Sequence, residues 1–197
     1  MSFPVCSDII DDRNFIEWHK GIRYYGVWCL PISNTQWLQK IQDIQQKFSH
    51  VLLPNYLRMP HITIATVGLM CATQYVLVRK QLNLLASLLW QPIVIQWQGV
   101  SSYAHSPIIK VTSPHQQLCY LRKTLHQVTQ GDDTDEYDPH ITLGYYNSVV
   151  NLASLINQLA IKIDDEMLVN ELCFCTYATD SIKSELIVQE KFILADY

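Results

Sequence analysis

The hexapeptide MPHITI at residues 59–64 is almost repeated by DPHITL at residues 138–143. In a β-strand, residues i and i+2 project from the same face, so His61 and Thr63 share one face and Ile62 points to the other. The second copy pairs His140 with Thr142 in the same way, and a proline is tolerated as the first residue of a strand. Each copy therefore predicts a strand with one face that packs and one polar face that is available for chemistry.

The two copies lie in matching places of a repeated pattern. Each follows an amphipathic helical segment and a loop, and each precedes another helical segment. The separation of residues 61 and 140 is too long for a solenoid period and suits two facing lobes. We therefore predict an α+β fold that is bilobal, with two pseudo-symmetric lobes, each an antiparallel sheet flanked by helices, and an active cleft between them.

Apolar periodicity sets the expected elements. It predicts strands at residues 24–30, 59–67, 92–97, 107–111, 139–146, 168–177 and 185–194, and helices at residues 35–48, 75–89, 113–128 and 151–161. Asn34 or Thr35 is the expected N-cap of the first of these helices. Residues 21–197 should form a single bilobal domain. Residues 1–20 should form an N-terminal extension, in which Phe15 and Trp18 indicate a docked helix rather than a free tail.

Composition narrows the class of partner and compartment. The chain has 197 residues, 49% of them hydrophobic, and a formal net charge of −4, which predicts a soluble globular protein. An acidic run at residues 132–138 disfavours sequence-blind binding of a long polyanion. The cysteines are scattered without a C-x-x-C pair, and the start carries acids where a secretory signal needs a basic end. We therefore expect a cytoplasmic protein with no membrane span.

Two imidazoles on opposite sides of one phosphorus atom suit in-line displacement. With pKa values near 6.5, one ring can take a proton from the attacking oxygen while the other gives one to the leaving oxygen. The hydroxyls of Thr63 and Thr142 would stabilise charge on the non-bridging oxygens. We predict His61, Thr63, His140 and Thr142 as catalytic residues, with no metal and no cofactor. Because the motifs are equivalent, the sequence leaves open which histidine is the acid.

A single H-x-T triplet carries little information, because a lone histidine on a strand is usually a hydrogen-bonded structural residue. Agreement of two copies at Pro, His, Ile and Thr in matching places of a repeat favours catalysis over coincidence. Paired H-x-T motifs resemble those of the two-histidine (2H) phosphoesterase superfamily, in particular its 2'-5' RNA ligase-like and cyclic phosphodiesterase branch. The segment RYYGVWCLP at residues 23–31 is similar to that family's first strand.

The resemblance implies metal-independent hydrolysis of a 2',3'-cyclic phosphate or of a 2'-5' phosphodiester. The implied partner is a small nucleotide or an oligonucleotide end, with no long duplex and no membrane, and we expect a monomer. Aromatic faces can stack on bases and an arginine can meet a phosphate. The predicted substrate-binding residues are Tyr25, Tyr103, Tyr145, Tyr146 and Arg58. Lys110, on a neighbouring strand, is interpreted as a solvated surface charge.

Two alternatives remain open from the sequence. The first is a non-catalytic module that binds a nucleotide or an RNA end. Its support is the aromatic, uncharged stretch Gly144, Tyr145 and Tyr146, which stands where RNA ligase-like members tend to carry a basic residue. The second is a true 2'-5' RNA ligase, which would join fragment ends reversibly.

Overall fold

The computed structural model describes residues 6–128, 136–157 and 165–194. Its helices are α1 (Asp12–Trp18), α2 (Thr35–Phe48), α3 (Ala72–Ala86), α4 (Gln117–His126) and α5 (Leu152–Asn157), with a 3-10 turn at Pro114–Gln116. Its strands are β1 (Tyr24–Pro31), β2 (His61–Leu69), β3 (Ile93–Ser102), β4 (Pro107–Thr112), β5 (His140–Thr142), β6 (Glu166–Val169), β7 (Glu171–Ala178) and β8 (Leu186–Ile193). Most of the acidic run and the end of the predicted fourth helix lie outside the described residues. Within those ranges, no helix combines the length and the apolar character that crossing a membrane requires.

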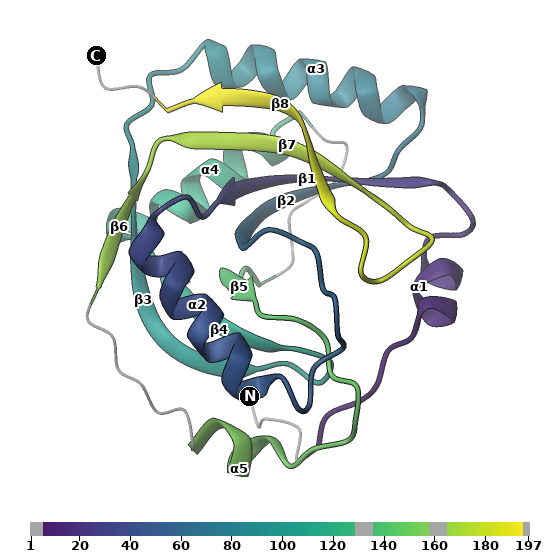
Figure 1. Cartoon of the computed structure of the whole chain (residues 1–197). Helices are drawn as coiled ribbons and strands as arrows, with labels where there is room; N and C mark the ends of the chain where they lie inside the picture. Colours follow the sequence, from purple (N-terminus) through teal and green to yellow (C-terminus); the bar gives the residue numbers. More distant parts are fainter. Residues whose placement is uncertain (1–5, 129–135, 158–164, 195–197) are drawn as a thin grey trace.

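The strands form one antiparallel sheet in the order β6-β3-β4-β5-β2-β1-β7-β8 (Figure 1). The α+β class is confirmed, but the prediction of a separate sheet in each lobe needs correction. The sheet has two halves of four strands, and they meet where β2 pairs with β5, with Ile62 opposite Ile141. The physical reason is that two adjacent motif strands satisfy each other's backbone groups, whereas two separate sheets would leave both edges open.

The sheet curls because neighbours in the chain sit at its opposite ends. We predicted one strand over residues 168–177, but the structure divides this run at Asn170 into β6 and β7. Strand β6 pairs with β3 at one edge, and β7 pairs with β1 and β8 near the other. One intervening residue can connect these strands only if the two edges approach each other. The result is a curled half-barrel (Figure 1).

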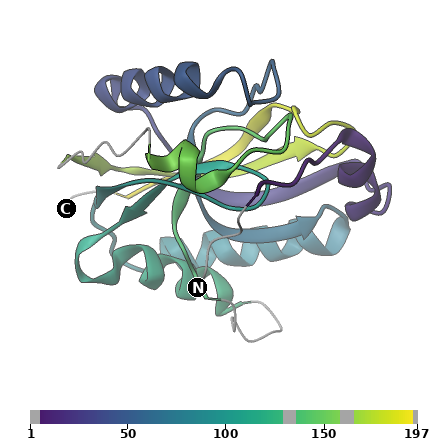
Figure 2. The same ribbon diagram turned by 90° about the horizontal axis from the view of Figure 1, so that it is seen from below.

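Helix α2 forms as its apolar spacing predicts. The Asn34 side chain accepts a hydrogen bond from the Trp37 backbone N–H at 3.0 Å, so Asn34 is the N-cap. The buried residues of this helix are Trp37, Ile41, Ile44 and Phe48. Helix α2 lies on one side of the sheet, and α3 and α4 lie on the other (Figure 2).

The apolar side chains of the motif strands face α3 and α4. On β1, the Trp28 indole N–H donates to the Gln81 side chain at 2.7 Å, and the Gln81 amide donates to the Leu125 carbonyl at 3.0 Å. These bonds connect the sheet to both helices. Ile62 shares this face because it pairs with Leu30, which is two residues from Trp28. The polar side chains of the motifs therefore project from the opposite face.

We expect the join between the halves to be sensitive to small losses of volume. Changing Ile141, which is fully buried, to Val should lower the free energy of unfolding by about 0.5–1.5 kcal/mol, because the removed methylene leaves an unfilled space. The control is Ile187→Val on β8, where the side chain is 48% exposed and the change should stay within about 0.5 kcal/mol. Urea denaturation of both variants measures the difference. Equal effects would contradict the importance of this join.

Candidate active site

The two motif strands are direct neighbours in the sheet. Their antiparallel pairing places Ile62 opposite Ile141. Counting outward from this pair sets His61 opposite Thr142 and sets the second histidine opposite the first threonine. Directly opposed residues share a face in an antiparallel pair, and all four polar residues of the motifs are half-buried, whereas both isoleucines are fully buried.

The register also fixes the spacing of the two imidazoles. His61 and His140 lie on the diagonal of the cross-strand pairs, and such diagonal neighbours have Cβ atoms about 7–8 Å apart. Thr63 and Thr142 occupy the other diagonal. This spacing leaves room for one small group, such as a phosphate, between the rings. The structure therefore brings the four predicted catalytic residues together on one surface.

Each imidazole makes the same backbone hydrogen bond. The Nδ1–H of His61 donates to the Met59 carbonyl at 2.7 Å, and the Nδ1–H of His140 donates to the Asp138 carbonyl at 2.7 Å. A carbonyl oxygen can only accept, so Nδ1 carries the hydrogen in both rings. The Nε2 of each neutral ring is therefore left as a base, and its orientation is fixed by the bond on the opposite side of the ring.

The surroundings of the two rings differ in charge. The pKa of His61 is lowered from 6.5 to about 4, mainly by burial and further by the charges of Arg58 and His140. Burial also lowers the pKa of His140, but the hydrogen bond to the Asp138 carbonyl and the Asp138 carboxylate oppose that effect, while Lys110 adds to it. His61 thus has the cation Arg58 nearby and no anion among the causes of its shift, whereas His140 has both the anion Asp138 and the cation Lys110 beside it.

Three side chains form a polar cluster around His140. Lys110 is its partner across β4 and β5, and the Lys110 Nζ lies 3.1 Å from the Asp138 carboxylate. The Tyr103 hydroxyl donates to the same carboxylate at 2.9 Å, and the Tyr103 ring meets the His140 ring edge-on at 5.0 Å. Lys110, interpreted from the sequence as a solvated surface charge, is 39% exposed and forms an ion pair beside His140. Its strand pairing could not be seen in the sequence.

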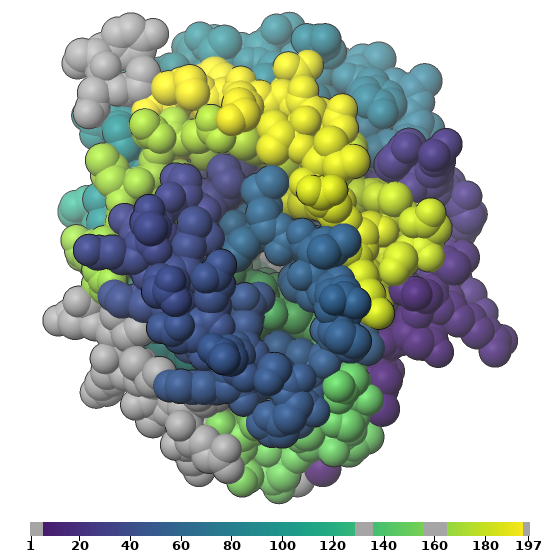
Figure 3. Space-filling view, in the orientation of Figure 1, coloured from purple at the N-terminus to yellow at the C-terminus, as the bar shows by residue number. Residues whose placement is uncertain are grey.

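A cavity of about 460 Å³ opens beside His61. Its lining residues come from α1 and the residue after it, from β1, β2, β5, β7 and the start of β8, and from the segments that flank the motifs. They are Phe15, Trp18, His19, Tyr25, Val27, Tyr56, Arg58, His61, Thr63, Thr66, Thr142, Tyr145, Tyr177 and Leu186. Figure 3 shows the molecule hollowed near the centre of one face, between the blue atoms of α2 and those of the segment before β2, with green atoms below them.

The predicted substrate-binding residues separate into three groups. Tyr25, Tyr145 and Arg58 line the cavity. Tyr103 contacts His140 on the other side of the motif pair. Tyr146 is fully buried and its hydroxyl lies 2.8 Å from the Ser102 hydroxyl, so its assignment to substrate binding needs correction.

The backbone at the end of β5 explains why Tyr145 lines the cavity whereas Tyr146 is buried. Gly144 has a φ of +146°, which favours glycine. The chain then pairs with Leu52 at Tyr146, which turns this ring into the core. Tyr145 remains half-buried at the cavity.

Arg58 is held in place while part of its guanidinium stays available. Its Nε donates to the Ser184 carbonyl at 3.2 Å, and its guanidinium carbon lies 3.9 Å from the centre of the Tyr177 ring. The Nη2 atom is buried without a hydrogen-bond partner. Arg58 as a whole lines the cavity, so its positive charge favours an anionic ligand there. Over the described residues, no cluster of three or more His, Cys, Asp or Glu side chains could hold a metal ion.

Comparison with known proteins agrees with this geometry. The chain matches the family model described as "2'-5' RNA ligase superfamily" over residues 30–181. Escherichia coli LigT, in a crystal structure complexed with NADP+, is similar at 13% identity and a TM-score of 0.59, covering 88% of this chain and 99% of that chain.

Further solved structures share the fold. Protein TT0787 of Thermus thermophilus is similar at 13% identity and a TM-score of 0.66, covering 86% of this chain and 97% of that chain. Escherichia coli LigT complexed with 3'-AMP is similar at 12% identity and a TM-score of 0.61, covering 88% and 99%. No curated protein matches this sequence. The family match spans most of the chain, and the protein therefore belongs to the 2'-5' RNA ligase superfamily of 2H phosphoesterases.

Proposed function

We propose that this protein is a metal-independent phosphodiesterase that hydrolyses a 2',3'-cyclic phosphate or a 2'-5' phosphodiester on a small nucleotide or an oligonucleotide end. The supporting observation is the pairing of two H-x-T strands in which each histidine makes the same Nδ1–H bond to the carbonyl two residues before it. That arrangement offers two fixed Nε2 atoms to a single phosphate. Few structural roles would require two histidines that are both held in this way.

His61 is the general base in this proposal. Burial and the nearby Arg58 cation lower the pKa of its ring and favour the neutral form, so its Nε2 can take a proton from an attacking water molecule. The water oxygen then bonds to phosphorus as the bond from phosphorus to the ribose oxygen breaks. In the reverse direction, or with a ribose hydroxyl as the nucleophile, the same geometry would support transesterification and joining of ends.

His140 is the general acid. In the singly protonated pair, the proton belongs on the ring that stands beside a carboxylate, and that ring is His140, next to Asp138. The imidazolium gives this proton to the leaving ribose oxygen, which completes the exchange of protons. Thr63 and Thr142, the neighbours of the two rings, are placed to donate their hydroxyl hydrogens to the non-bridging oxygens. Such donors act where negative charge develops.

Phosphorylated nucleotides are the substrate class that the surroundings favour. The cavity combines the guanidinium of Arg58 with the rings of Tyr25 and Tyr145, and no carboxylate is among the lining residues that the structure describes. Solved structures of E. coli LigT hold 3'-AMP, ATP and phosphate, which supports nucleotide binding for this chain. A cavity of this volume suits a mononucleotide or one end of an oligonucleotide rather than a duplex.

Replacing either histidine should abolish most of the turnover. We expect His61→Ala and His140→Ala each to lower kcat for nucleoside 2',3'-cyclic phosphates or 2'-5' dinucleotides by about 10²–10⁴-fold, because each removes one proton transfer. His50→Ala is the matched control, since His50 is exposed and lies outside the site. Product formation is followed in excess chelator. A wild-type protein that turns over none of these substrates, or only with added metal, would contradict the proposal.

The pH profile should be bell-shaped with its optimum below pH 6.5. The value of kcat/KM should fall at low pH as His61 gains a proton near its pKa of about 4. It should also fall as pH rises through the lowered pKa of His140, because the acid then loses its proton.

The variant Lys110→Gln tests the role assignment. Removing this cation should raise the pKa of His140, so the basic limb of the profile should move to higher pH while the acidic limb stays in place. Lys191→Gln is the control, because Lys191 forms an equivalent ion pair with Glu171 on β7 and β8. A basic limb that does not move, or an acidic limb that moves instead, would overturn the assignment of His140 as the acid.

A further inference from the structure

Helix α1 supplies part of the cavity, although it precedes the segment that matches the family. That segment begins at residue 30, whereas α1 spans Asp12–Trp18. Phe15, Trp18 and His19 nevertheless line the same cavity as His61. The N-terminal extension is therefore a wall of the candidate active site.

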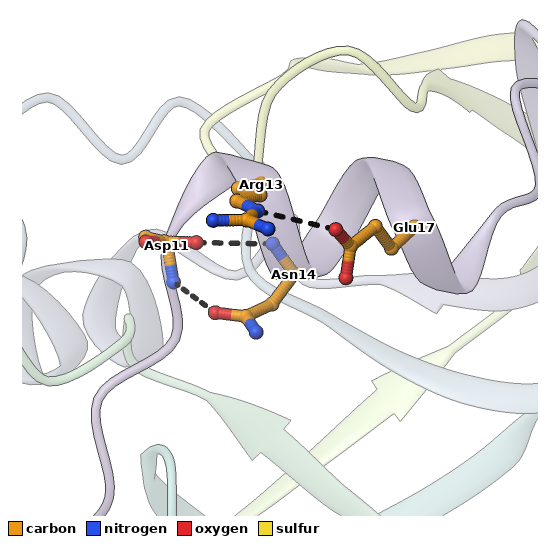
Figure 4. A network of polar contacts seen from close by, with 4 residues as sticks. All are labelled: Asp11, Arg13, Asn14 and Glu17. Carbon is orange, nitrogen blue, oxygen red and sulfur yellow. Dashed lines mark hydrogen bonds and ion pairs between the residues drawn. The ribbon is translucent and has the colours of Figure 1, made fainter.

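This short helix is stabilised at its first turn. The Asp11 carboxylate accepts from the Asn14 backbone N–H at 3.0 Å, and the Asn14 side chain accepts from the Asp11 backbone N–H at 3.5 Å, which forms a capping box (Figure 4). The Arg13 guanidinium lies 3.2 Å from the Glu17 carboxylate along the exposed side (Figure 4). The capping box sets where α1 begins.

Tertiary contacts hold α1 against the rest of the molecule. The Asp12 carboxylate accepts from the Ser181 hydroxyl at 3.0 Å and from the Ile182 backbone N–H at 2.7 Å. Phe15 is buried in a cluster with Ile10 and Ile182. The helix is therefore a fixed part of the fold, and its position relative to the cavity is defined.

The last turn of α1 continues into a stack of aromatic rings. The Nδ1–H of His19 donates to the Phe15 carbonyl, so its Nε2 accepts from the Tyr177 hydroxyl at 3.3 Å. The Tyr177 ring stacks on Tyr25 at 5.4 Å, and the His19 ring meets Tyr25 edge-on at 5.2 Å. The rings of His19, Tyr25 and Tyr177 are therefore already packed against one another.

Trp18 differs from the other lining residues of α1. Phe15 and His19 are 4% and 6% exposed, whereas Trp18 is 56% exposed. An indole exposed at the mouth of a cavity is a surface on which another flat ring can stack. Among its described lining residues the same cavity has the Arg58 cation and no carboxylate, so the complementary ligand is anionic at one end and aromatic at the other.

We propose that Trp18 is the stacking platform for the nucleobase of the substrate, so that the N-terminal helix sets the selectivity of this enzyme for substrates that carry a base. The inference rests on the proposed function for the phosphate-bearing part of the substrate. The base, the ribose and the phosphate would extend from Trp18 past Arg58 to the imidazole pair. Trp18 is thus a specificity-determining residue that takes no part in proton transfer.

The test compares substrates with and without a base. We expect Trp18→Ala to raise KM for adenosine 2',3'-cyclic phosphate about tenfold or more, the loss typical of one base–aromatic stack, with little change in kcat. The KM for 1-O-methylribose 2',3'-cyclic phosphate should not change. Trp18→Phe should restore much of the affinity. The control is Ile16→Ala, because Ile16 lies on the same helix, is 43% exposed and is absent from the cavity lining.

Equal effects of Trp18→Ala on both substrates, or no effect on either, would overturn this inference. Calorimetric titration with 3'-AMP separates its failure from failure of the proposed function. If the wild-type protein lacks turnover but binds 3'-AMP, and Trp18→Ala weakens that binding while Ile16→Ala does not, the platform is supported and the catalytic proposal fails. Failure of the wild-type protein to bind 3'-AMP or to turn over either substrate would overturn both.

Discussion

The pairing of β2 with β5 is the contact on which the rest of the structure depends. It joins the two halves of the sheet and, at the same time, sets the distance between the two imidazoles. A slip of one residue would turn one histidine toward α3 and α4 and expose an isoleucine, because side chains alternate between the faces of a strand. The fully buried Ile62 and Ile141 oppose such a slip. Packing of the two isoleucines on one face of the sheet thus fixes the positions of the motif histidines and threonines on the other face.

The repeated motifs give the two histidines equivalent backbone positions, and the difference between Met59 and Asp138 makes their surroundings unequal. The segments MPHITI and DPHITL share Pro, His, Ile and Thr, but Met59 stands where the second copy has Asp138. Both residues offer the same backbone carbonyl to the histidine two positions later. Only Asp138 adds a carboxylate, which also binds Lys110 and Tyr103. Identical backbone geometry can therefore hold two rings with different proton affinities, as a base and an acid require.

Local pattern in the sequence was sufficient for much of the fold and for the motif geometry. The apolar face of α2 and the alternation of β2 follow from residue spacing alone, and both are found in the structure. The break at Asn170 was missed, because Asn170 and Glu171 interrupt the apolar run without a glycine or proline to mark a turn, and the different partner strands of β6 and β7 are not visible in the sequence. Nor could the sequence show the proximity of Lys110 to His140, which depends on which strands become neighbours. Tyr146 was misassigned because a positive φ at the preceding glycine decides which way its ring turns.

The curl of the sheet and the N-terminal extension, residues 1–20, make the surroundings of the two imidazole rings unequal. On the side of His61, α1 and the edge formed by β7 and β8 enclose a cavity with Arg58 and several aromatic rings. On the side of His140, a polar cluster of Tyr103, Asp138 and Lys110 occupies the surface. A ligand that places its bulk in the cavity must present its phosphate to the rings from one side. The asymmetry around the two rings thus has two sources, which are Asp138 at the start of the second copy and, outside the motifs, α1 and the edge formed by β7 and β8.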